Sequence, residues 1–363
     1  MVITNQPFFE ADQRSNDQNY LLFLLRKRFH EFVDEQSNAS GMVETIMKSI
    51  KSKSIVICLA LFAVIIACRG KTTRIQDEFC VEGIKESTPV FTSGSEVIGT
   101  AVRMMDEMTM IYIPAGRFEM GSDDGNNDAQ PAHKVFLDSY WIDRTEVTNG
   151  QYQKCVADGT CTPPLFTDNV FTKILFNKNN TRLLDSYFDN SAFIDYPVVY
   201  VDSKQAQTYC RWVGGRLPTE AEWEKAARGM DGRKYPWGNT FFGDRLNYCD
   251  KNSDCRWPDS EWDDGYAEHA PVGSYPDGAS PFGVLDMAGN VNEWVADWFD
   301  YDYYSTSPKE NPTGPACGEF RVLRGGSWDN QIWEINVYNR TESKPGYQSD
   351  GVGFRCASSS GTN

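Results

Sequence analysis

The cysteines are the residues of this 363-residue chain with the clearest chemical potential. Eight of the ten follow position 68, and two pairs, Cys155–Cys161 and Cys249–Cys255, repeat a spacing of six residues. An even number of cysteines in turn-rich sequence is typical of disulfide bonding in an oxidising compartment, which would mean that the protein is exported. Structural zinc is the alternative, but no CxxC spacing occurs and only two histidines lie after position 68. Zinc binding is therefore disfavoured.

A further cysteine, Cys68, ends a segment with the pattern of a lipoprotein signal peptide. Residues 47–53 carry three lysines, and residues 55–66 form an uninterrupted apolar run. The run is too short to span a bilayer comfortably but has the length of a signal-peptide core. Ile65-Ile66-Ala67-Cys68 then resembles a bacterial lipobox, whose cysteine is diacylated and becomes the new N-terminus. The alternatives are a short transmembrane anchor and a buried helix.

The signal segment, residues 47–68, sets the expected organisation of the chain. Translation is expected to begin at Met47, which leaves residues 1–46 as an upstream segment; a cytoplasmic tail is the alternative. Residues 69–105 are polar with a Ser/Thr/Gly-rich stretch and are expected to be a linker. A single domain without internal repeats is expected over residues 106–358, followed by a short tail, 359–363.

Composition limits the kinds of partner. The net charge of −16 leaves no basic surface to neutralise phosphates, so a nucleic-acid partner is not expected. Hydrophobic residues make up 40% of the chain and aromatic residues 13%, which is enough for a large core. Abundant glycine, tryptophan and tyrosine favour a compact fold with many irregular loops over a helical bundle.

Short helices and strands are expected along the domain. Three helices are expected, starting at Thr148, Ser203 and Thr219 and ending before Gly159, Gly214 and Gly229. Each start carries a side chain able to cap the helix, and each end carries a glycine. Strands are expected at Met110–Ile113, Lys134–Leu137, Tyr140–Ile142 and Phe320–Leu323. Long irregular stretches, 162–196 and 230–275, lie between them and would need disulfides, ions or aromatic anchors to hold them.

A series of short motifs runs in order from residue 113 to residue 356. They are IPAGRF (113–118) with MGS (120–122), EVTN (146–149), RLPTEAEWE (216–224), YPWG (235–238), APVG (270–273), DMAGNV (286–291), RGGSW (324–328) and GFRC (353–356). Together they resemble the formylglycine-generating enzyme family, also called the sulfatase-modifying factor family. The resemblance implies a mixed α+β domain related to C-type-lectin-like folds, with short helices and strands and long irregular loops.

The resemblance also implies two calcium sites built from loop oxygens. One would use the side chains of Asn247 and Asp264 and the carbonyls of Tyr248 and Tyr266. The other would use the side chains of Asp286 and Glu293 and the carbonyls of Gly289 and Val291. Carboxylate and carbonyl oxygens suit this hard cation, although Asn and Asp are also common turn and cap residues. Asn292 stands where the family usually has tryptophan, which we expect to loosen the second site.

The same resemblance implies disulfide partners. Cys210 and Cys356 match a bridged pair of the family, and Cys155–Cys161 and Cys249–Cys255 would be local bridges. Cys80 and Cys317 then remain for a fourth bridge.

One part of the family pattern is missing. Family enzymes oxidise a substrate cysteine to formylglycine, using two cysteines a few residues after Arg-Gly-Gly-Ser that hold copper(I). Here no cysteine occurs between Cys317 and Cys356. Asp329, Asn330 and Glu334 offer only hard oxygen ligands, whereas copper(I) prefers thiolates. We therefore expect no copper and assign no catalytic residue. Relatives that use iron hold it with histidines of an additional helical domain, which does not fit this chain either.

The expected function is a non-catalytic binding or scaffold module of the bacterial cell envelope, periplasmic or surface-exposed. Its lipid would attach it to a membrane, and its partner would be a protein or a glycan. The aromatic stretch Trp294–Tyr304 offers a candidate groove, although Trp294 and Trp298 are expected in the core. The alternative is an oxidase with a rearranged metal site formed by Asp329, Glu334 and His269.

Overall fold

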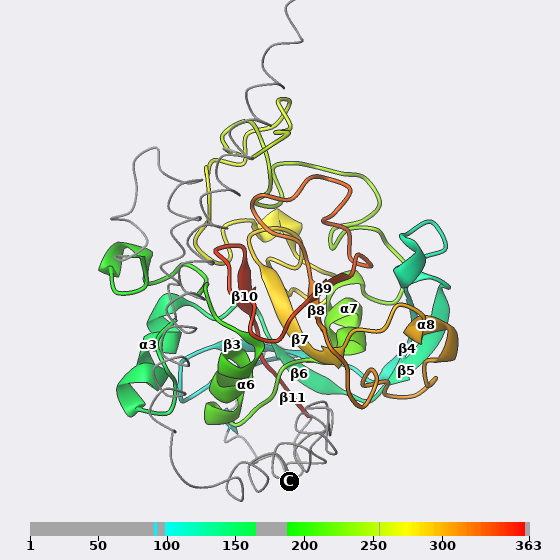
Figure 1. The fold of residues 1–363 in the computed structure, drawn as a ribbon, viewed down its shortest axis with the longest axis horizontal. Coiled ribbons are helices and arrows are strands. Elements are labelled where there is room, and N and C mark those ends of the chain that lie inside the picture. The colour runs from blue at the N-terminus through cyan, green and yellow to red at the C-terminus, as the bar shows by residue number, and fades with distance from the viewer. Residues whose placement is uncertain (1–90, 93–98, 165–186, 254, 360–363) are drawn as a thin grey trace, which may run out of the picture. The chain divides into compact units, whose positions relative to one another are not determined.

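The computed structural model describes residues 91–92, 99–164, 187–253 and 255–359, all within the second of two compact units, residues 78–363 (Figure 1). The upstream segment, the signal peptide with Cys68 and most of the expected linker lie outside the described residues. No helix in the described ranges is long and apolar enough to cross a membrane.

A five-stranded sheet forms the base of the domain. Its order is β1 (Phe91–Thr92), β2 (Thr100–Arg103), β3 (Thr109–Ile113), β6 (Tyr140–Asp143) and β11 (Ala357–Ser359), and every neighbouring pair is antiparallel. Ala357 lies opposite Ile142, so the end of the domain returns to a strand more than two hundred residues earlier. This closure carries the adjoining segment 352–356 into the core.

A second sheet has four strands. Its order is β10 (Val352–Phe354), β7 (Asn292–Trp298), β8 (Arg321–Arg324) and β9 (Thr341–Ser343), with β10 parallel to β7 and the other pairs antiparallel. A separate hairpin pairs β4 (Gly116–Met120) with β5 (His133–Leu137). Three of the sequence motifs border the second sheet: DMAGNV (286–291) ends just before β7, RGGSW (324–328) begins at the last residue of β8, and GFRC (353–356) begins within β10.

The three longer helices begin and end close to the cap residues and glycines predicted from the sequence. They are α3 (Asn149–Asp158), α6 (Ser203–Trp212), α7 (Glu220–Arg228) and the single turn α8 (Tyr303–Thr306), with 3-10 turns at Asn127–Ala129, Ser191–Phe193 and Pro276–Gly278. Each of the three longer helices begins with a complete capping box, in which the cap side chain and the third residue satisfy each other's backbone N–H groups. The three predicted helices are therefore confirmed.

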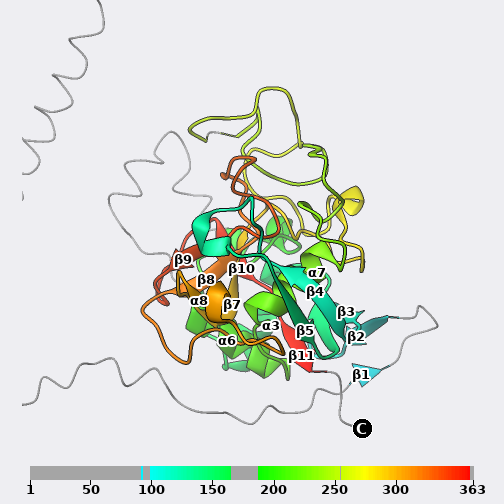
Figure 2. The ribbon, with the colours of Figure 1, turned by 90° about the vertical axis from the view of Figure 1, so that its right-hand side faces the viewer.

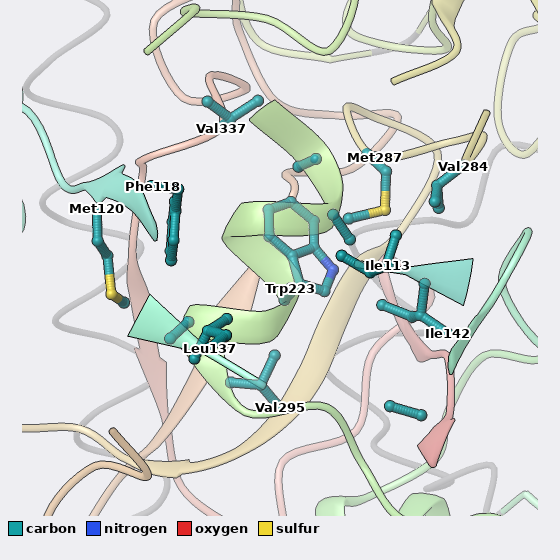
Figure 3. Close-up of a cluster of buried hydrophobic side chains, with 14 of the residues drawn as sticks. Ile113, Phe118, Met120, Leu137, Ile142, Trp223, Val284, Met287, Val295 and Val337 are labelled. Carbon is teal, nitrogen blue, oxygen red and sulfur yellow. The ribbon is translucent and has the colours of Figure 1, made fainter. Parts of the chain in front are cut away.

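The core is centred on α7. Trp223 is fully buried, and apolar side chains from β3, β4, β5, β6 and β7 surround it (Figure 3). A second cluster joins α3 and α6 to Trp294 of β7 and Phe354 of β10. The long connections between α7 and β7 extend to one end of the domain in both views (Figures 1 and 2). Those loops carry most of the expected cation ligands.

Two expectations need correction. The domain begins before residue 106, because β2 is a full member of the first sheet and Arg103 is buried against Asp106 and Asp143. It also continues through Ser359, the last residue of β11. The expected linker, residues 69–105, therefore overlaps strands β1 and β2 of the first sheet.

The aromatic stretch Trp294–Tyr304, which begins within β7, does not line a groove as a unit. Trp294 and Trp298 are buried, as expected for core residues. Tyr304 is also buried and packs on the α7 cluster, together with the half-buried Tyr303, whereas Tyr301 is exposed. The stretch therefore contributes mainly to packing.

Candidate functional site

The Arg-Gly-Gly-Ser segment forms a sharp turn at the end of β8. Gly325 and Gly326 both have a left-handed backbone, with φ of 97° and 76°. A β-carbon on Gly326 would approach the Ile335 side chain to 2.3 Å, so only glycine fits there. The turn places the buried Ser327 beside Asn292, the first residue of β7.

Ser327 belongs to a compact polar cluster. Its hydroxyl donates to Asp329 Oδ1 at 2.6 Å, and Asn292 Nδ2 donates to Ser327 Oγ at 3.1 Å. Asn330 Oδ1 accepts from the Ser327 N–H at 2.9 Å and from Asn292 Nδ2 at 3.2 Å. The cluster offers oxygen and amide groups that are largely bound to one another. Such a donor set does not fit copper(I), which needs soft sulfur ligands.

The alternative metal site of Asp329, Glu334 and His269 is not assembled. Glu334 Oε2 accepts from the Gln331 N–H at 3.0 Å, while the His269 ring binds the Asp350 carbonyl and packs against Trp328. Within the described ranges, no three His, Cys, Asp or Glu side chains converge on a position that could hold a metal ion. Asp329, Glu334 and His269 are therefore not brought together as a three-residue ligand group in the described part of the chain.

Asp264 contacts two of the residues expected in the first calcium site through their backbone N–H groups. Its carboxylate accepts the N–H groups of Tyr248 and Tyr266, each at 2.9 Å, and burial beside Asp250 raises the pKa of Asp264 to about 7. Asn247 is fully buried, and its Oδ1 has no hydrogen-bond donor among the described residues. A buried acceptor without a donor fits a cation ligand at this position.

The second expected site is only partly formed. Asp286 lies in a buried turn and accepts the Gly273 N–H at 2.6 Å. Gly289 comes so close to Asn247 that a β-carbon would meet the Asn247 carbonyl at 2.0 Å, and Val291 is fully buried. Glu293, however, forms an ion pair with Arg355 at 2.7 Å. The structure thus places the expected carboxylate ligand in contact with a protein cation.

Two residues outside the predicted set connect these loops. Asn290 donates its N–H to the Asn247 carbonyl, and its side chain accepts from Asn247 Nδ2 and donates to Glu146 Oε1, both at 3.0 Å. The Asn290 carbonyl accepts the Trp328 N–H, so the RGGSW turn joins the same network. Asn290 and Glu146 both belong to motifs read from the sequence, and that membership was the signal available for them.

Three disulfides connect the described residues, and they are the expected pairs. Cys155–Cys161 and Cys249–Cys255 close short loops, and Cys210–Cys356 joins α6 to the segment between β10 and β11. Cys317 is exposed and forms no disulfide with a described residue. Its expected partner, Cys80, lies outside the described residues.

A separate open hollow on the surface lies beside β9. Phe320, Glu342, Ser343, Lys344, Gly346 and Tyr347 line it. None of the expected metal-site or polar-cluster residues contributes to its wall. The functional interpretation therefore rests on the polar cluster around Ser327 and on the loops that carry the expected calcium ligands.

Comparison with known proteins identifies the domain. The family described as sulfatase-modifying factor enzyme 1-like domain matches residues 95–360. The formylglycine-generating enzyme of Streptomyces coelicolor is 34% identical, over 71% of this chain and 92% of the enzyme. The inactive C-alpha-formylglycine-generating enzyme 2 of Mus musculus is 33% identical, over 69% of this chain and 86% of that protein.

One relative, a kinase, matches over only part of its own length, and two solved structures share the fold. The serine/threonine-protein kinase pkn1 of Chlamydia caviae is 35% identical over 68% of this chain, but the match spans only 37% of the kinase. The solved Treponema denticola variable protein 1 covers 73% of this chain with a TM-score of 0.55 at 25% identity. PvdO from Pseudomonas aeruginosa covers 76% with a TM-score of 0.54 at 24% identity, which shows a common fold. The chain belongs to the sulfatase-modifying factor enzyme 1-like family and has its mixed α+β, C-type-lectin-like fold.

Proposed function

We propose that this chain is a non-catalytic binding module of the family, stabilised by calcium and held in the bacterial cell envelope by a lipid on Cys68. The observation that carries the proposal is the polar cluster of Asn292, Ser327 and Asn330 at the RGGSW turn. In the family enzymes, the two cysteines follow this turn in the sequence. These side chains hydrogen-bond to one another and provide no thiolate.

The chemistry of the cluster disfavours the family's oxidation reaction. Copper(I) requires soft ligands, and none of the ten residues after Ser327 is a cysteine. The mouse relative whose name describes it as inactive indicates that the family includes members without this activity. A domain that keeps the fold but not the ligands is best explained as a module that binds a protein or a glycan.

The proposed calcium has a structural role in the loops between α7 and β7 and no role in catalysis. Asn247 and Asp264, with the carbonyls of Tyr248 and Tyr266, would hold the ion of the first site. The donorless Asn247 Oδ1 and the buried Asp264 carboxylate both support a bound cation there. The ion would fix the long loops between α7 and β7, which contain little regular secondary structure.

Export and anchoring rest on two observations. The three disulfides fit an oxidising compartment, and the sequence ending at Cys68 has the lipobox pattern. The proposed location is therefore the cell envelope, with the domain outside the cytoplasm.

The test is an oxidation assay with the full chain purified in detergent. The chain is loaded with copper(I) and calcium in air and incubated with a sulfatase-type cysteine peptide, which is followed by mass spectrometry. The Streptomyces coelicolor formylglycine-generating enzyme is the positive control. An unmodified peptide beside a working control is the expected result. Conversion of the peptide cysteine to formylglycine would overturn the proposal.

A further inference from the structure

An apolar tip ends the hairpin that joins β2 to β3. Nine large hydrophobic side chains are exposed among the described residues, and three of them lie within four positions: Val102, Met104 and Met105, which are 40%, 61% and 51% exposed. We call these three residues the apolar tip. Turns are usually built from polar residues and glycine, and exposed hydrophobic side chains that gather in one place mark a contact surface. The hairpin therefore offers a candidate contact surface.

A buried polar network fixes the position of the apolar tip. The Arg103 N–H donates to the Met108 carbonyl at 2.8 Å, which closes the turn. The buried Arg103 side chain donates to Asp106 Oδ1 at 2.9 Å and to Asp143 Oδ1 of β6 at 2.7 Å. The Tyr209 hydroxyl of α6 donates to Asp106 Oδ2 at 2.6 Å. Because the turn is held by β6 and α6, the exposed side chains are presented on a fixed backbone, which lowers the entropic cost of binding.

The charged side chains next to the apolar tip are paired. Arg103 and Asp106 form an ion pair at 2.6 Å, and Lys154 of α3 and Glu107 form one at 3.0 Å. These four charges sum to zero, although the whole chain carries a net charge of −16. Approach to an apolar medium is costly for unpaired charges. The pairing therefore lets this part of an acidic protein approach such a medium.

The part of the chain that carries Cys68 enters the domain beside the apolar tip. Strand β1 is antiparallel to β2, and its first residue, Phe91, lies opposite Arg103, the residue before Met104. Residues 69–90 separate Cys68 from Phe91 and can span at most about 70 Å when extended. A lipid on Cys68 would therefore keep the bilayer within reach of the hairpin. Figure 2 shows β2 and β3 at the end of the domain away from the long loops between α7 and β7.

We propose that the apolar tip contacts the lipid bilayer that holds the acyl chains of Cys68. This inference rests on the proposed lipid anchor. The acyl chains attach the protein but leave the orientation of the domain open, whereas a second contact beside the anchored end fixes it. The domain then rests on the hairpin, and the loops between α7 and β7 face away from the membrane toward a partner.

The first experiment maps methionine oxidation on the full lipid-bearing chain in phosphatidylcholine vesicles. Hydrogen peroxide is added, and sulfoxide formation at each methionine is followed by peptide mass spectrometry. Met230, in the turn after α7, is 57% exposed and serves as the internal control. Met104 and Met105 should be oxidised at least about fivefold more slowly than Met230, because the bilayer covers their sulfur atoms. Equal rates at the three methionines would overturn the inference.

The second experiment uses Lys154, whose ammonium group lies beside the hairpin. Its acylation by an amine-reactive reagent is measured on the same vesicles for the wild type, for Met104→Gln with Met105→Gln, and for the control Met230→Gln. The double variant should increase the labelling rate at Lys154, whereas the control should not change it. All three proteins should unfold at the same temperature, since the altered side chains are exposed. An unchanged rate in the double variant would count against the bilayer contact.

Three further outcomes identify another occupant or a missing anchor. Protection of Met104 and Met105 that grows with the protein-to-lipid ratio would indicate a second copy, and protection in cell envelopes but not in pure lipid would indicate a protein partner. Either result would overturn the proposal. Fatty-acid labelling of Cys68 tests the anchor separately. A labelled chain with unprotected methionines refutes the bilayer contact alone, whereas an unlabelled chain refutes the anchor and the contact together.

Discussion

The disulfide Cys210–Cys356 should contribute more to stability than either short-loop bridge. It closes a loop with a sequence separation of 146, compared with 6 for Cys155–Cys161. Cross-linking removes conformational entropy from the unfolded chain, and the loss grows with the logarithm of loop length. The chain-entropy relation gives about 5 kcal/mol for the long loop and about 2 kcal/mol for the short one. The expected difference is about 3 kcal/mol.

The two bridges form a matched pair for this test. All four cysteines are buried, so replacing each pair by alanine leaves a similarly small defect in the folded core. We would measure the free energy of unfolding in urea by tryptophan fluorescence for Cys210→Ala with Cys356→Ala and for Cys155→Ala with Cys161→Ala, at one calcium concentration. Equal losses, or a larger loss for the short-loop variant, would refute the entropic argument.

Three further predictions concern the core, the pH dependence and the anchor. Trp223→Phe should cost about 2–4 kcal/mol, because it removes buried volume and the donor to Glu293 Oε2; a loss below about 1 kcal/mol in urea unfolding would contradict that role. Burial beside Glu220 raises the pKa of Asp297 to about 8, far above its value of 3.8 in an unfolded chain. The folded protein then holds one more proton than the unfolded chain between about pH 4 and pH 8, so this group's stabilisation is complete below about pH 4 and is lost as the pH rises through about 8. Asp297→Asn should therefore lose less stability than wild type between pH 5 and pH 9 in thermal melts, and parallel losses would show that Asp297 does not titrate in this way. Cys68→Ala should abolish fatty-acid labelling and release the chain from the membrane fraction, and retained labelling would exclude Cys68 as the modified residue.

Local signals in the sequence were sufficient for the helices. A cap residue, its partner three positions later and a terminal glycine act within one or two turns, so Thr148, Asp202 and Thr219 mark helix starts without knowledge of the rest of the fold. The order of motifs identified the family, and the resemblance supplied the three disulfide pairs. Strand β7 was missed because it is buried along nearly its whole length and carries acidic residues, so it has no alternating pattern.

The pairing of buried charges was decided by tertiary structure. Glu293 and Arg355 are 62 residues apart, and only the parallel pairing of β7 with β10 brings them into contact. Glu146, in the segment after β6, accepts a hydrogen bond from Asn290, which lies 144 residues later in the sequence. The resemblance implied a cation ligand at Glu293, whereas Glu146 was not among the predicted ligands. Which carboxylate pairs with an arginine and which with an asparagine depends on distances of a few ångströms in a medium of low dielectric constant, and those distances exist only in the folded chain.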